Sequence, residues 1–140
     1  MKKILLTLTC VFGLSMTASA VQNSAVMLQH KGNITTYEPE QVNDAIADAV
    51  DGDVIYLTAG DFPGFTINKQ ISVKGSGMKT MINGSLIVEN PNVALNNVFI
   101  GYMEIQYGYI KSKVNNLNIS QCRFIRGLWF EGITENSLID

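Results

Sequence analysis

The residues of this chain best suited to ligand chemistry are basic and aromatic side chains in its last third. Lys111, Lys113 and Arg123 are cations, and Tyr102 and Tyr107 come shortly before them. A fixed cation can neutralise the carboxylate of an acidic sugar, and an exposed aromatic ring offers an apolar surface with a polar tip. We therefore take these five residues as a candidate surface for binding a polysaccharide.

Catalytic residues are harder to assemble from the same region. A lyase that acts on an acidic glycan needs a base, together with a cation or calcium ion that neutralises the sugar carboxylate. Glu104 and Glu131 are the nearby carboxylates, but no spacing pairs them as a glycosidase pair. The sequence has no phosphate loop or nucleophile elbow. These residues favour a non-catalytic protein over an enzyme, which would be lyase-like, and we assign no catalytic residue.

Metal ligands and thiol chemistry are also poorly supported. The single histidine, His30, lies far in sequence from Cys122, so zinc is not expected, and Cys122 alternates with apolar neighbours as a core residue does. His30 is interpreted as an exposed residue without a role. Four acidic residues could be read as a calcium site, but they lack the alternating ligand positions of a calcium loop: Asp44, Asp48, Asp51 and Asp53. We expect no cofactor and no metal site.

The first 20 residues have the pattern of a secretory signal peptide. Lys2 and Lys3 precede a mostly apolar stretch from Ile4 to Met16, which Ala18-Ser19-Ala20 follows as a small-residue cleavage site. The apolar stretch is shorter than a membrane-spanning helix requires. We expect cleavage after Ala20, no transmembrane segment, and a secreted, periplasmic or cell-surface protein.

The composition predicts one folded domain. The chain has 140 residues, of which 46% are hydrophobic and 16% charged, with a formal net charge of −2. This apolar content argues against a disordered chain, and the acidic balance argues against binding to nucleic acid. We divide the sequence into the signal peptide (1–20), a lead-in (21–37) and a folded part (38–140).

The folded part begins with a short amphipathic helix and continues as strands. The spacing predicts a helix over 39–50, with Pro39 in its first turn and an apolar face made of Val42, Ala45, Ile46, Ala49 and Val50. After Asp53, apolar alternations of three to five residues end at Gly, Asn or Asp, which predicts short strands and tight corners.

A faint repeat runs through these strands. Aligning 71–73 with 93–95 and then with 117–119 gives steps of about 22 to 24 residues, typical of a β-solenoid. We therefore expect an all-β fold, a parallel β-helix of three to four coils with the helix as its N-terminal cap. Its last coil would be open, and self-association or a longer chain would cover it.

The first coils resemble those of a known superfamily. Five segments carry the resemblance: Gln41–Ile46, Gly52–Leu57, Gly60–Phe62, Ile67–Lys69 and Ile71–Gly77. They are similar to the N-terminal portion of secreted right-handed parallel β-helix proteins, the pectate-lyase-like superfamily. The resemblance implies a right-handed coil. It also implies one of the superfamily's functions, whose members include lyases, hydrolases and esterases of polysaccharides as well as adhesins and tail spikes.

Two functions therefore stay open. The first is an exported, non-catalytic module that binds polysaccharide or has a structural role. The second is the N-terminal part of a polysaccharide lyase or glycoside hydrolase with its active site beyond residue 140, because enzymes of this superfamily are usually much longer. Tyr109 and Trp129 belong to the same aromatic group as Tyr102 and Tyr107, but we interpret them as residues that fill the core or cover a loop.

Overall fold

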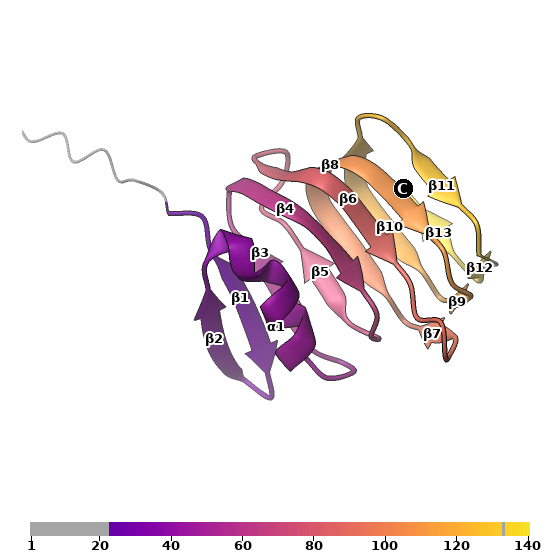
Figure 1. Ribbon diagram of the computed structural model, residues 1–140, viewed down its shortest axis with the longest axis horizontal. Helices are drawn as coiled ribbons and strands as arrows, with labels where there is room; N and C mark the ends of the chain where they lie inside the picture. The colour runs from indigo at the N-terminus through magenta and orange to yellow at the C-terminus, as the bar shows by residue number, and fades with distance from the viewer. Residues whose placement is uncertain (1–22, 133) are drawn as a thin grey trace, which may run out of the picture.

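The protein is a β-solenoid of about four turns (Figure 1). We describe it from a computed structural model that defines residues 23–132 and 134–140. The predicted signal peptide lies outside these residues. Within them, no helix is long and apolar enough to span a membrane.

Strands make up most of the structure, with one short helical segment near the start. In chain order the elements are β1 (Val26–His30), β2 (Asn33–Tyr37), the 3-10 turn η1 (Pro39–Gln41), α1 (Val42–Asp48), β3 (Val54–Leu57), β4 (Gly60–Ile67), β5 (Ser72–Lys74), β6 (Thr80–Val88), β7 (Leu95–Asn96), β8 (Phe99–Ile110), β9 (Val114–Asn115), β10 (Asn118–Phe124), β11 (Leu128–Phe130), β12 (Thr134–Glu135) and β13 (Leu138–Ile139).

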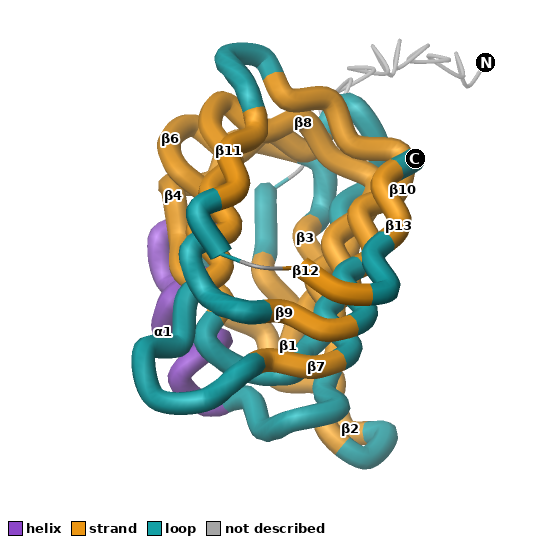
Figure 2. The backbone as a smooth tube through the Cα atoms, turned by 90° about the vertical axis from the view of Figure 1, so that its right-hand side faces the viewer, coloured by secondary structure: helices purple, strands orange, loops and turns teal. Residues whose placement is uncertain are grey.

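Parallel pairing between successive coils gives the solenoid three faces. The first face consists of β3, β5, the starts of β8 and β10, and β13. The second face consists of β4, β6, the rest of β8, the end of β10, and β11. The third face is narrow and consists of β7, β9 and β12. Figure 2 shows these three short strands stacked along one side of the coil.

The interior is filled by columns of aliphatic side chains, one residue from each coil. On the first face Ile55, Val73, Ile100 and Ile119 lie in register, and each is almost fully buried. On the second face Ile67, Val88 and Ile110 form a similar column. In a strand, alternate side chains point to opposite sides. This explains why the sequence alternates apolar and polar residues in short runs.

Asparagine builds the corner that follows the third face. Asn97, Asn116 and Asn136 occupy equivalent corner positions in successive coils, with φ angles of 54°, 56° and 50°. Asparagine tolerates this left-handed conformation better than most residues do. The Asn116 amide also donates a 3.0 Å hydrogen bond to Asn97 Oδ1 in the coil below. The corners predicted from the Asn clusters are therefore confirmed.

The lead-in contains two strands that the sequence did not predict. β1 pairs antiparallel with both β2 and β3, so this hairpin extends the first face beyond the first coil. Polar and apolar residues do not alternate regularly in β2, and all of its side chains except that of Tyr37 are exposed. The strand signal was consequently weak in this segment.

The helix is shorter than predicted. α1 ends at Asp48, and Ala49 has extended backbone, with φ −65° and ψ 151°. Val50 was predicted on the apolar face but is exposed. The reason is that Asp53 accepts the Val50 N–H at 2.8 Å, which replaces a helical hydrogen bond. The buried residues Val42, Ala45 and Ile46 remain as the apolar face, and α1 packs against β4 and β1.

The repeat alignment was wrong in detail. Val73 lies in register with Ile100 and not with Leu95, and Ile100 lies in register with Ile119. Leu95 belongs to the third face, where it pairs with Val114. The coils differ in length because the turns between faces differ, so a constant period misaligns them.

Candidate functional site

The most distinctive side-chain group on the outer surface is an aromatic stack on the second face. Tyr109 and Trp129 lie in register on β8 and β11, with ring centroids 5.1 Å apart and planes 15° apart. Tyr107, two residues before Tyr109, also lies beneath the indole at 6.3 Å. We call these three residues the aromatic stack.

The aromatic stack points outward because of strand alternation. Ile110 and Gly108 are buried, so their neighbours Tyr107 and Tyr109 must point to the other side of β8. The Trp129 side chain is 42% exposed, whereas the sequence interpretation had it filling the core or covering a loop. The core-filling part of that interpretation was wrong, because Tyr109 and Trp129 both belong to the outward-facing set of their strands.

A shallow polar depression adjoins the aromatic stack at the turn from the second face to the third. It has a volume of about 470 Å³, and its lining includes Glu89, Asn92, Lys111 and Lys113. Lys111 connects it to the stack, since its Nζ lies 6.0 Å from the centre of the Tyr109 ring. Aromatic rings beside hydrogen-bonding groups form a surface that fits a ligand with both apolar and hydroxyl-bearing sides.

The charges in this depression are balanced. Lys111 follows β8, while Glu89 and Glu131 follow the strands on either side, β6 and β11. Among the described residues Lys111 makes no ion pair. The other predicted lysine, Lys113, pairs with Glu135 at 3.1 Å. Both lysines lie in the connection between β8 and β9.

Arg123 is held by a carboxylate away from the depression. It lies on β10 in register with Glu104 of β8, and its guanidinium pairs with that carboxylate. The Glu104 side chain is nearly buried, so a cation above it offsets the cost of burying a charge. The hydrogen bond and the negative charge of Glu104 raise the pKa of Arg123 above its ordinary value. Arg123 therefore serves the local charge balance of the coil.

Tyr102 lies at the corner between the first and second faces. It has a φ of 61°, and its ring packs at 6.1 Å from Phe99, on the first-face side. Its carbonyl accepts the Gly77 N–H at 2.8 Å. Of the five predicted binding residues, the structure brings Tyr107, Lys111 and Lys113 to one region, while Tyr102 and Arg123 lie apart from the depression.

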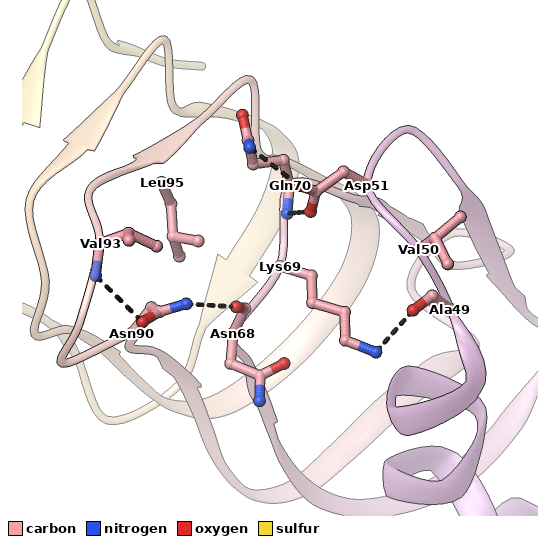
Figure 3. Close-up of a pocket in the computed structure, with 9 residues that line it drawn as sticks. All are labelled: Ala49, Val50, Asp51, Asn68, Lys69, Gln70, Asn90, Val93 and Leu95. Carbon is pink, nitrogen blue, oxygen red and sulfur yellow. Dashed lines mark hydrogen bonds between the residues drawn. The ribbon is translucent and has the colours of Figure 1, made fainter.

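A second hollow lies between the end of α1 and the turns that follow β4 and β6 (Figure 3). Its volume is about 490 Å³, but its polar groups already bind one another. Lys69 Nζ donates hydrogen bonds to the carbonyls of Ile46, Ala47 and Ala49. Asp51 accepts from both the backbone and the side chain of Gln70. Lys69 therefore caps the C-terminus of α1. The polar groups that line this hollow hold the fold together and are not left free for a ligand.

A buried carboxylate joins β1 to the loop after α1. Asp53 accepts the Val50 N–H and lies 2.8 Å from His30 Nδ1, so His30 is not the residue without a role that the sequence suggested. Burial raises the pKa of Asp53, but the hydrogen bonds from Val50 and His30 and the charges of His30 and Lys31 outweigh it. The net pKa of Asp53 is therefore below its ordinary value.

This lowered pKa predicts acid sensitivity. The ionised form of Asp53 stabilises the fold at pH values above the unfolded-state pKa of about 4, and this contribution is lost as pH falls through the folded-state pKa. At pH 7, Asp53→Asn should cost about 1 to 3 kcal/mol in the free energy of unfolding. Urea unfolding between pH 7 and pH 2 should show the wild type losing more stability than the variant. Equal losses would contradict this role.

Cys122 is a core-facing thiol with little reactivity expected. Its sulfur lies near the carbonyls of Ile100 and Ser120, and burial raises its pKa to about 11. Alkylation requires the thiolate. In a Cys10→Ser background, iodoacetamide at pH 8 should label the folded protein at least about tenfold more slowly than the urea-unfolded protein. Equal rates would show that the thiol is open to solvent.

Metal ligands do not gather within residues 23–132 and 134–140. No group of three or more His, Cys, Asp or Glu side chains lies close enough there to hold an ion. The acidic residues of α1 and its following loop instead make separate contacts: Asp48 accepts from the Tyr37 hydroxyl, Asp51 binds Gln70, and Asp53 binds His30.

Comparisons with protein-family models, with curated proteins and with solved structures find no match. The candidate site consequently stands on its own geometry, which consists of the aromatic stack and the adjoining polar depression.

Proposed function

We propose that this protein is a non-catalytic β-solenoid module that binds polysaccharide through the aromatic stack and the polar depression beside it. The observation that carries the proposal is the continuity of the two parts, since Lys111 lines the depression and also lies over the Tyr109 ring. The apolar face of a sugar would lie against the rings, and its hydroxyls would bind Glu89, Asn92 and Lys111.

The charge balance favours a neutral or mixed polysaccharide over a strongly acidic one. Arg123 and Lys113 are each paired with a carboxylate, and Lys111 is flanked by Glu89 and Glu131. A strongly acidic polymer would gain from the lysines and lose against the two flanking carboxylates. We expect binding to fall only slightly with added salt, in contrast to a surface of unpaired cations.

The proposal includes the finer properties of the fold and the location. A right-handed coil of the pectate-lyase-like kind, with α1 as its N-terminal cap, agrees with the motif order between residues 41 and 77. Export after cleavage at Ala20 would bring the module to the periplasm, the cell surface or the medium. Extracellular polysaccharide is the ligand class available there.

Polysaccharide binding can be measured by affinity electrophoresis in native gels that contain neutral or uronate polymers. The wild type should be retarded by at least one polymer, and Tyr109→Ala should weaken retardation about tenfold, or about 1.4 kcal/mol. Tyr102→Asn is the matched control, because it removes an exposed tyrosine from outside the site and asparagine tolerates the positive φ. Its affinity should equal that of the wild type.

Two outcomes would count against the proposal. One is an equal loss in Tyr102→Asn and Tyr109→Ala, which would indicate a general effect on folding or binding elsewhere. The other is new ultraviolet absorbance from unsaturated uronate when the protein is incubated with pectin or alginate. That result would replace a binding module by a lyase.

A further inference from the structure

The outer side of the first face carries a lysine held between two aromatic rings. Strand alternation points Tyr56, Lys74 and Phe99 outward, because the buried column of Ile100 occupies the alternate positions. Lys74 lies on the middle strand of the three, and its Nζ is 5.9 Å from the centre of the Tyr56 ring and 5.5 Å from that of Phe99. We call Tyr56, Lys74 and Phe99 the cation cluster.

A glycine fixes the position of the Phe99 ring. A Cβ atom added at Gly101 would lie 2.6 Å from two atoms of this ring, so the ring covers the backbone there. Gly101 is in register with Lys74 on the neighbouring strand. The ring consequently lies beside the lysine, where the negative face of an aromatic system attracts a cation. The cation cluster is therefore held in place by the sheet itself.

Lys74 has no anionic partner in the described part of the chain. It makes no ion pair there. The outward side chains of β2, β1, β3 and β5 and of the starts of β8 and β10 include no carboxylate. Lys74 is also partly buried, and a charge that is partly withdrawn from water interacts more strongly with an anion. This face therefore offers one cation that a ligand can neutralise.

Apolar side chains surround the cation cluster on the same surface. Met27 lies in register with Tyr56 on the neighbouring strand. Ile34, Val54 and Phe99 form a second row across the strands, and Ile34 is 63% exposed. Surfaces that are rich in aromatic residues and methionine and poor in carboxylates are typical of protein–protein interfaces. The composition of this face therefore favours a protein as its ligand.

The single cation separates a protein from other anionic ligands. Polyanions such as nucleic acids, and membranes of anionic lipids, are bound by several cations at once. A second copy of the chain is also a poor match, because a two-fold contact of this face with itself would bring two like charges together. One carboxylate between apolar groups matches one cation between apolar side chains.

We propose that the first face binds a segment of a partner protein through one Asp or Glu side chain, which pairs with Lys74. The apolar residues on either side of that carboxylate would lie on Tyr56, Phe99 and Met27. A charge-assisted hydrogen bond from the ammonium fixes the position of the segment. The inference does not depend on polysaccharide binding, since the two sites lie on different faces. In Figure 2, β10 and β13 lie on the right and β4 and β6 on the left.

Selection from a library of random short peptides displayed on phage tests the proposal without knowledge of the partner. The immobilised protein should enrich peptides that carry a single Asp or Glu between apolar residues. An enriched peptide is then synthesised with a fluorescent label, and its affinity is measured by fluorescence anisotropy. Replacing its acidic residue by the corresponding amide should weaken binding at least about tenfold, because the ion pair is lost.

Variants of the protein place the peptide on the cation cluster. Lys74→Gln should weaken binding of the acidic peptide at least about tenfold and should not change binding of the amide peptide. Lys79→Gln is the matched control, since it removes an exposed lysine from the turn before β6, and its affinity should equal that of the wild type. Lys74→Glu should bind a peptide with lysine at the acidic position better than it binds the acidic peptide.

Each other outcome overturns the proposal. A selection that enriches no peptide, or only peptides without a carboxylate, would show that this face is not a site for an acidic segment. Enrichment of peptides with runs of acidic residues would indicate a polyanion. Equal affinity of Lys74→Gln and the wild type would place the peptide elsewhere. Tyr109→Ala should leave peptide binding unchanged, so failure of this proposal and failure of polysaccharide binding are separate results.

Discussion

Replacing Ile100 by Ala should lower the free energy of unfolding by about 2 to 5 kcal/mol. Ile100 is fully buried in the middle of its column, between Val73 below and Ile119 above. Removing three carbons there leaves a cavity that rigid neighbouring coils cannot close, so the lost transfer energy and the cavity cost add. Urea unfolding followed by circular dichroism measures the change.

Ile139→Ala is the matched control, because it makes the same replacement in the same column at the last coil. Ile139 is already 53% exposed, so the cost should be below about 1 kcal/mol. Similar costs for the two variants would contradict the burial of Ile100 as the source of its large effect.

Lys69→Met should lower the free energy of unfolding by about 2 kcal/mol, the second large effect. The Lys69 ammonium donates hydrogen bonds of 2.8, 2.5 and 2.5 Å to the carbonyls of Ile46, Ala47 and Ala49. These carbonyls end α1 and have no partner further along the helix. Methionine keeps most of the apolar stem but leaves them without a donor, and the positive charge at the negative helix end is lost.

Lys79→Met serves as the control for charge removal. Lys79 is exposed in the turn before β6, where it makes no ion pair among the described residues. Its replacement should change stability by less than about 0.5 kcal/mol. If Lys69→Met were equally mild, the cap would be a minor feature, and the position of α1 would depend on its buried face alone.

Much of the fold could be predicted from short-range patterns. Alternation with a period of two predicted short strands after Asp53, such as β3 and β11, and the Asn residues that end these runs predicted the corners. The pairing between coils was harder to predict than the strands, because it depends on the number of residues in each turn. The hairpin of β1 and β2 was missed since exposed polar side chains in β2 hide the alternation.

The candidate site was predicted in part, and the misses have a physical cause. Tyr107 and Tyr109 face the same side because both lie on β8, a single strand of 12 residues, whereas the sequence predicted only short strands. The ion pairs of Arg123 with Glu104 and of Lys113 with Glu135 join different coils, so they depend on the same register that the constant period misaligned. Lys69, within a segment that resembles known β-helix proteins, serves the helix cap in this structure.

Amide chemical-shift mapping with an oligosaccharide of a polymer that retards the protein tests the proposed binding face most directly. Uniformly nitrogen-labelled protein would be titrated while its backbone amides are followed by NMR. Shifts should change at Tyr107, Tyr109 and Lys111 and in the turn at 89–92, and the β1–β2 hairpin should stay unchanged. Changes centred on the hairpin, the first face or the hollow around Lys69 would contradict the assignment of polysaccharide binding to the second face.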